Sequence, residues 1–168
     1  MSSYLDTSSN NFLSNYKIIK YGSDVLQYTL SSWTDMLGSE IAYTPGGDAT
    51  FVVYEYSFSM AKYSSNNINN VITKLLHSSD GSSWADYLNN TSISFGSTVG
   101  NVRRRGLCNI KLLLNSWGNT EKVLKLQGKR LNSSSAGQFH KLTDFLDSGG
   151  SAGDRYFRPI VSCYSITQ

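Results

Sequence analysis

Apolar and polar residues alternate along several segments of the chain, and the clearest alternation lies at residues 51–58. Four apolar or aromatic residues fall on one face of the strand that this spacing predicts: Val52, Tyr54, Tyr56 and Phe58. They share a face because successive side chains of a strand point to opposite sides. The other face is partly apolar as well, so we predict a strand at 51–58 that is covered on both sides.

Further runs of this kind are separated by segments rich in Gly, Asn and Ser. They predict strands at 39–43, 70–78, 92–97, 102–117, 121–131 and 155–168. Turn signals stand at 44–49 (TPGGDA), at Asp80-Gly81 and at Gly118-Asn119, where we expect a hairpin. The segment 139–146 has the spacing of a short helix, and we also expect one helical turn near 84–89. The pattern predicts an all-β fold, an antiparallel jelly-roll β-sandwich of roughly eight to ten strands.

The pattern changes near Trp33, and this change predicts the domain organisation. Residues 1–32 are interpreted as an N-terminal arm or docking segment, in which polar residues precede two short extended pieces. Residues 33–168 are predicted to form the jelly-roll β-sandwich. We expect the sandwich to stay folded without the arm, because terminal segments of low periodicity usually contribute little to a core.

Composition is consistent with one folded domain and argues against several partners. The chain is 39% hydrophobic and 16% charged, which is unlike a disordered protein. Its net charge of +3 is too small to indicate a nucleic-acid partner. No segment approaches the roughly 20 apolar residues of a membrane helix, and the N-terminus has no signal-peptide pattern. We expect neither nucleic-acid binding nor membrane insertion.

Residues with catalytic or metal-binding chemistry are few. His77, His140, Cys108 and Cys163 are far apart in the sequence and lack metal-ligand spacing. The two cysteines are either buried thiols or a bridge between neighbouring strands, and the sequence leaves both possibilities open. A nucleophile elbow, a phosphate-binding loop and a recognisable catalytic pair of carboxylates are all missing. We therefore expect no enzymatic activity, no cofactor and no metal.

Two charged features are interpreted as structural. Glu55 lies within an aromatic strand, where it is either a catalytic acid or the partner of a Lys or Arg across a sheet or subunit boundary; we favour the ion pair. Arg103-Arg104-Arg105 is interpreted as a solvated strand edge that discourages aggregation, with an interface cluster and nucleic-acid binding as alternatives.

The order of motifs resembles a known class of proteins. The motifs are WTDMLGSEIAYTP, FVVYEYSFSMA, ITKLLHSSDGSSW, CNIKLLLNSW, KVLKLQGKRLNSS and YFRPIVSCYSI. Together they are similar to the trimeric TNF/C1q-like jelly-roll domains of structural proteins of tailed marine bacteriophages, over about residues 33–168. The resemblance implies a virion protein that forms homotrimers, as a capsid decoration, tail or fibre component. It also implies that residues 1–32 dock onto other virion proteins.

Aromatic residues supply the candidate interfaces. We expect strand 51–58 and the C-terminal strand to be central neighbours, with Tyr54, Tyr56 and Tyr164 at a trimer interface. The alternative function is a carbohydrate-binding module that recognises host-surface glycans. Its candidate ligand-facing aromatics lie beside loops: Tyr63, Trp84, Tyr87 and Trp117. Trp33 and Trp84 are otherwise interpreted as caps of the sandwich core.

Overall fold

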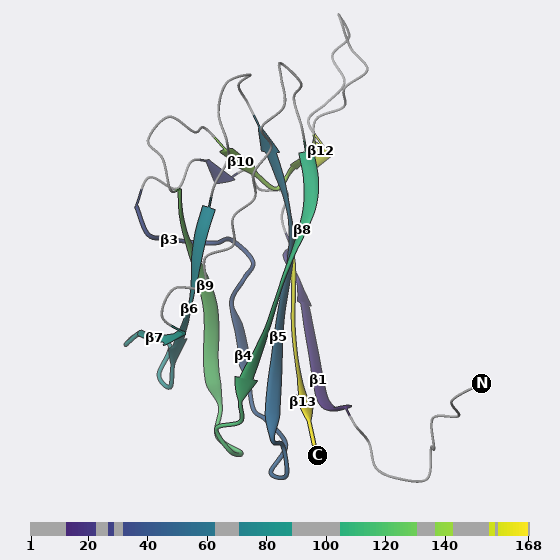
Figure 1. Cartoon of the computed structure of the whole chain (residues 1–168), viewed down its shortest axis with the longest axis vertical. Helices are drawn as coiled ribbons and strands as arrows, with labels where there is room; N and C mark the ends of the chain where they lie inside the picture. Colours follow the sequence, from purple (N-terminus) through teal and green to yellow (C-terminus); the bar gives the residue numbers. More distant parts are fainter. Residues whose placement is uncertain are drawn as a thin grey trace, which may run out of the picture.

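The computed structural model describes residues 13–22, 27–28, 32–62, 71–88, 105–130, 137–142, 155–156 and 158–167. Every secondary-structure element of these residues is a β-strand, as Figure 1 shows, so the predicted all-β class is confirmed. The helical turns predicted near 84–89 and 139–146 are wrong where the chain is described, because strands occupy that part, and residues 143–146 lie outside it. Within the described ranges there is no helix long and apolar enough to span a membrane.

The first sheet is built around β5 (Phe51–Lys62), which has neighbours on both sides. One side pairs with β8 (Arg105–Asn115) along almost the whole of β5. The other side pairs first with β13 (Ile160–Ile166) and then with β10 (Gly137–Phe139). Two further strands complete the sheet beyond these neighbours: β1 (Leu13–Lys20) beside β13, and β2 (Gln27–Tyr28) beside β10. All of these pairs are antiparallel.

The second sheet is built around β9 (Lys122–Arg130) and β6 (Val71–Ser78), which pair antiparallel. The far side of β6 pairs with β7 (Ala85–Leu88), so the turn predicted at Asp80-Gly81 lies in the connection of a hairpin. The far side of β9 pairs with two short strands, β3 (Thr34–Asp35) and β4 (Ile41–Tyr43). A separate small ladder joins β11 (Lys141–Leu142) to β12 (Arg155–Tyr156).

The two sheets pack face to face and enclose an apolar core (Figure 1). Alternation explains the choice of side chains: each inner strand turns every second residue inward, and these residues are apolar or aromatic. Fully buried examples come from both sheets: Tyr54, Tyr56, Phe58, Ile110 and Leu114 from the first, and Leu75, Leu124 and Leu126 from the second. The predicted sandwich is therefore confirmed.

Gly118-Asn119 does not close a hairpin, contrary to the prediction. The strand before it, β8, belongs to the first sheet, and the strand after it, β9, belongs to the second. Gly118 has a φ of +78°, the left-handed conformation that glycine adopts without strain. The turn chemistry was therefore recognised correctly, but periodicity within a strand does not reveal which sheet the strand joins.

The sandwich does not begin at residue 33, as the domain prediction had it. Residues 13–20 form β1, which pairs with β13 at the edge of the first sheet. Asn15, with a φ of +51°, lies at the irregularity in this pairing. Lys17 donates a hydrogen bond of 2.6 Å to the carbonyl oxygen of Ala42 in β4, which ties β1 to the second sheet. Part of the predicted arm is thus a strand of the fold.

The pairing of β5 with β13 confirms the predicted central neighbours. Tyr54 is opposite Cys163 and Val53 is opposite Tyr164 in this ladder. With β1 outside β13 and β8 outside β5, these two strands lie in the middle of the first sheet. This position defines which of their side chains face the core and which face outward.

Candidate functional site

The first sheet has an outer face, the side that points away from the second sheet. Register places residues on it in rows across the four strands β1, β13, β5 and β8. One row runs from Ile18 through Ser162 and Glu55 to Lys111, and the next includes Tyr164, Val53 and Leu113. Large apolar side chains on these strands are exposed: Tyr16 60%, Ile18 56%, Leu113 59% and Leu107 71%. An apolar surface of this kind is typical of an interaction site.

An ion pair lies among these apolar side chains. The Nζ atom of Lys111 is 2.7 Å from a carboxylate oxygen of Glu55, across the β5–β8 ladder. This hydrogen bond raises the pKa of Lys111, so the ammonium group stays protonated. Lys111 also lies 5.7 Å from the centre of the Tyr164 ring, and Tyr16 stacks on the same ring. The interpretation of Glu55 as a cross-strand ion-pair partner is confirmed.

Of the three tyrosines predicted at a trimer interface, only Tyr164 lies on the outer face. Tyr54 and Tyr56 point into the sandwich and are 0% exposed, so the prediction is wrong for these two residues. Their hydroxyls donate hydrogen bonds to the backbone carbonyl oxygens of Ser39 and Leu37. Burial raises the pKa of both hydroxyls well above the usual value. They are core residues whose polar ends reach the β3–β4 connection.

A second group of aromatic side chains closes the edge of the sandwich between β7 and β8. Tyr87 and Trp117 meet at 6.0 Å with their ring planes 67° apart, and both pack against the core. The Tyr43 ring lies edge-on to Trp117, with their ring centres 6.3 Å apart, and His77 contacts Tyr87. The Nζ atom of Lys122 lies 5.8 Å from the centre of the Tyr87 ring and 5.5 Å from that of Trp117. Two of the predicted ligand-facing aromatics are thus brought together.

The other two predicted ligand-facing aromatics are not part of this group. Trp84 lies on the second sheet with the Nζ atom of Lys125 3.8 Å from its ring centre, so a cation covers that face. Trp33 is similarly close to Lys74, at 5.1 Å. Both tryptophans are half-buried beneath lysines rather than set into the core, which corrects their interpretation as caps. Tyr63 lies outside the described residues.

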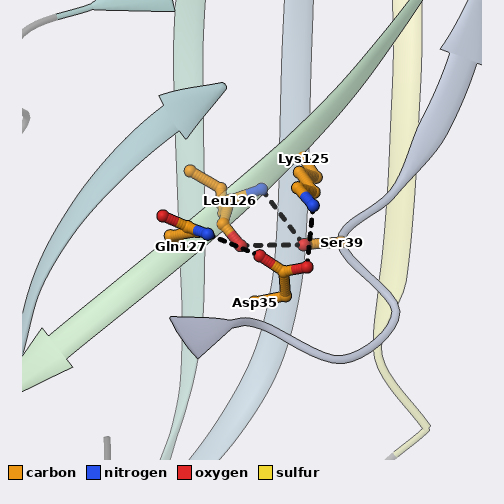
Figure 2. A network of polar contacts seen from close by, with 5 residues as sticks. All are labelled: Asp35, Ser39, Lys125, Leu126 and Gln127. Carbon is orange, nitrogen blue, oxygen red and sulfur yellow. Dashed lines mark hydrogen bonds and ion pairs between the residues drawn. The ribbon is translucent and has the colours of Figure 1, made fainter. Parts of the chain in front are cut away.

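A polar network fixes the chain where β3 and β4 join β9, as Figure 2 shows. The carboxylate of Asp35 accepts hydrogen bonds of 2.7 Å from both Lys125 and Gln127. Ser39 accepts a hydrogen bond from the backbone N–H of Leu126 through its hydroxyl oxygen and donates one to the carbonyl of the same residue. Burial raises the pKa of Asp35, but the bonds from Lys125 and Gln127 outweigh it and the net shift is downward. The network holds Asp35 ionised and is structural.

The cysteines and histidines do not converge on a reactive centre in the described part of the chain. Cys108 and Cys163 are both buried and neither is part of a disulfide, which settles the alternative that the sequence left open. Burial raises the pKa of the Cys108 thiol to about 11 and that of Cys163 to about 12, so both remain protonated and unreactive. His140 is fully buried next to Phe58, and burial lowers its pKa to about 4. No three His, Cys, Asp or Glu side chains of the described residues gather as a metal site.

Comparison with known proteins gives distant structural similarity and no family. No family model matches the chain, and neither does any curated protein. A structure of the infectious bursal disease virus Gx strain has a TM-score of 0.39 and 11% identity, over 90% of this chain and 37% of the viral chain. Dimeric latent PorU from Porphyromonas gingivalis has a TM-score of 0.36 and 11% identity, over 95% of this chain and 14% of PorU. The globular domain of zebrafish complement 1qA has a TM-score of 0.33 and 11% identity, over 91% of this chain and 96% of that domain. The chain therefore spans well under half of the viral and PorU chains.

Sequence reasoning missed the residues that complete these surfaces. Lys122 was not singled out because a lone lysine at the start of a strand has no pattern, although it follows a turn that carries Trp117. Tyr16 and Ile18 were assigned to the arm, yet YKIIK already has apolar residues in an extended segment. The pairing of β1 with β13 joins segments so distant in sequence that no local pattern indicates it.

Proposed function

We propose that the protein is a non-enzymatic structural component of a virion that assembles as a homotrimer, in a capsid decoration, tail or fibre. The order of sequence motifs supports the virion role, and the sandwich fold is compatible with it. One observation carries the proposal of self-association: the outer face of the first sheet exposes apolar side chains on β1 and β8. Attachment to other virion proteins through residues 1–32, a segment that includes β1, belongs to the same proposal.

The outer face has the composition of a subunit interface. Tyr16, Ile18 and Leu113 are each more than half exposed in the single chain. Covering such side chains stabilises an assembly by about 25 cal/mol per Å² of apolar area, less the entropy of association. Tyr164 stands between them, with Tyr16 stacked on it and Lys111 beside it. In a trimer built on this face, Tyr164 lies near the threefold axis.

Light scattering of the purified chain tests this proposal. The wild type is expected to have the mass of three chains, and Tyr164→Asp to dissociate it, because three carboxylates near one axis repel one another. Ile18→Asp places a charge on the same face and is expected to dissociate the trimer as well. Ile72→Asp is the matched control, since Ile72 is a half-buried residue that pairs with Lys129 in the second sheet.

The outcomes are separable. A monomeric wild type would end the proposal of self-association. A trimer that survives Tyr164→Asp and Ile18→Asp would place the interface elsewhere, and dissociation by Ile72→Asp would implicate the second sheet.

A second candidate function is a carbohydrate-binding module for host recognition. The observation that favours it is the meeting of Tyr87 and Trp117 beside Lys122 at one edge of the sandwich. Trp84 supports it less, because Lys125 covers one face of that ring. A glycan array with the purified protein tests this candidate, and absence of binding to every glycan would rule it out.

A further inference from the structure

Lysines of this protein repeatedly lie against aromatic rings. In three such places a carboxylate completes the arrangement at 2.7 to 3.0 Å: Lys74–Asp86, Lys111–Glu55 and Lys125–Asp35. The rings that accompany these pairs are those of Trp33, Tyr164 and Trp84. A ring, a cation and an anion are thus combined three times within the chain.

Lys122 lies beside two aromatic rings in the same way, but no carboxylate of the described residues pairs with it. Its Nζ atom is within 6 Å of two ring centres, those of Tyr87 and Trp117, which is the range of a cation–π contact. Among the residues that the structure describes, no carboxylate lies within ion-pair distance of it. Its neighbour Glu121 is exposed and makes no ion pair with it in that part of the chain. Within the described residues, Lys122 thus has two aromatic neighbours and no carboxylate partner.

The two rings are held in place by the chain itself. The hydroxyl of Tyr87 donates a hydrogen bond of 2.8 Å to the carbonyl oxygen of Asn115, which links β7 to the end of β8. The indole N–H of Trp117 donates one of 3.0 Å to the carbonyl oxygen of Thr120. Because these bonds use the polar atoms of both rings, a ligand meets a corner of fixed aromatic surfaces 67° apart. Fixing these side chains in advance reduces the entropy lost on binding.

We propose that Tyr87, Trp117 and Lys122 form a binding site for an acidic saccharide, a sugar that carries a carboxylate. The sugar ring packs its C–H face against an aromatic ring, and its carboxylate pairs with the Nζ atom of Lys122. This inference rests on the second candidate function and adds the class of ligand and the residues that select it.

The surroundings favour a saccharide over an acidic peptide. Two aromatic rings with planes 67° apart offer apolar area and few hydrogen-bond donors, which suits a rigid ligand with an apolar face. His77, 5.2 Å from Tyr87, has its pKa lowered by burial and by Lys122, so it stays neutral and adds no second positive charge. One cation beside two rings matches one carboxylate on a ring, whereas a peptide of several acids calls for several cations.

Binding can be followed on the full chain through the indole N–H resonances of its three tryptophans by NMR. The probes are a trisaccharide of galacturonic acid, a neutral trisaccharide of galactose and a triglutamate peptide. We expect the galacturonic acid probe to shift the Trp117 resonance with a dissociation constant of about 1 mM, and to leave those of Trp33 and Trp84 in place. The neutral probe is expected to bind at least about tenfold more weakly.

Substitution of the lysine tests its role. Lys122→Gln keeps a polar side chain that is one atom shorter and removes its charge, and it is expected to weaken binding of the acidic probe at least about tenfold. The matched control is Lys74→Gln, a lysine that already has a ring and a carboxylate, and it is expected to change nothing.

Each other outcome overturns the inference in a distinct way. Equal affinity for both sugars, unchanged by Lys122→Gln, would leave a sugar-binding module without selection for acid. Equal or better binding of triglutamate would identify a site for acidic peptides. Equal effects of the two lysine variants would indicate non-specific electrostatics, and no shift by any probe would remove the site. None of these results bears on the trimer, which light scattering tests independently.

Discussion

Some positions of this sandwich accept only one type of residue, because the backbone φ angle or a close contact excludes the others. Gly38 has a φ of +75°, and a Cβ atom there would be 2.7 Å from Cγ of Pro159 and 3.0 Å from Cβ of Tyr21. The same place is tied by a backbone hydrogen bond from Tyr21 to Pro159. Tyr21 follows β1 and Pro159 precedes β13. The β3–β4 connection can lie against both residues because residue 38 has no side chain.

Gly38→Ala is expected to destabilise the protein by about 2–4 kcal/mol, from the left-handed φ and the contact with Pro159 together. Urea unfolding measures this change. Gly47→Ala is the control, because nothing lies within 4 Å of a Cβ at that position, and it should change stability little. Equal effects of the two variants would contradict the interpretation.

His140 links stability to pH. Burial lowers its pKa from 6.5 to about 4, so the unfolded chain binds a proton that the folded chain rejects between those values. His140 therefore does not reduce the free energy of unfolding above pH 6.5. As the pH drops from 6.5 toward 4, this residue lowers the free energy of unfolding by up to about 3 kcal/mol. Its φ of +65° is one that Asn tolerates, so His140→Asn removes the titration and keeps the backbone.

Urea unfolding at several pH values across this window checks the effect. The stability difference between wild type and His140→Asn should shrink as the pH falls. His77→Asn is the comparison, and its slope should change less because His77 is only half-buried. A slope that is identical in wild type and His140→Asn would rule out the role of His140.

At the scale of elements, β1 illustrates what sequence could and could not predict. Its residues are extended and partly apolar, but their partner is β13, which follows much later in the chain. Strands 51–58 and 160–166 were recognised, and their adjacency too, because both have apolar faces on two sides. The helical turns predicted near 84–89 and 139–146 are wrong over the residues that the structure describes, where β7, β10 and β11 stand instead.

The candidate sites were predicted only in part for the same physical reason. Alternation identified one face of β5 but did not say which face was the inner one, so Tyr54 and Tyr56 were assigned to an interface instead of the core. Tyr87 and Trp117 were selected as aromatics beside loops, and the structure brings them together across the two sheets. The position of Lys122 beside both rings results from tertiary packing, so the sequence pattern could not predict it.

Deletion of residues 1–20 removes β1 and is expected to destabilise the sandwich. β13 would lose its hydrogen bonds to β1, and the contact from Lys17 to Ala42 would be lost as well. The midpoint of urea unfolding should fall, and the shorter chain should aggregate more readily through the newly exposed edge of β13. A chain that lacks only residues 1–12 keeps β1 and is the control. Unchanged unfolding of the shorter chain would restore the arm interpretation.

For the whole molecule, the two proposed surfaces lie on different parts of the sandwich. The outer face belongs to β1, β13, β5 and β8, which lie together in the first sheet (Figure 1), whereas the Tyr87–Trp117–Lys122 site is formed by β7, the β8–β9 connection and the start of β9. Assembly through the first surface therefore leaves the second available. A trimer of such subunits presents three copies of the ligand site. Simultaneous binding at these sites raises the overall affinity above that of a single weak contact with one sugar.

The position of β13 between β1 and β5 has a consequence for biosynthesis. β1 and β5 are synthesised long before residues 160–166. The position of β13 between those two strands therefore stays unfilled while most of the chain is made. During that interval β5 presents an unpaired edge of aromatic and β-branched residues, the kind of edge that pairs with other nascent chains. We therefore expect the yield of soluble protein to depend on translation speed and chaperone supply as well as on the stability of the finished sandwich.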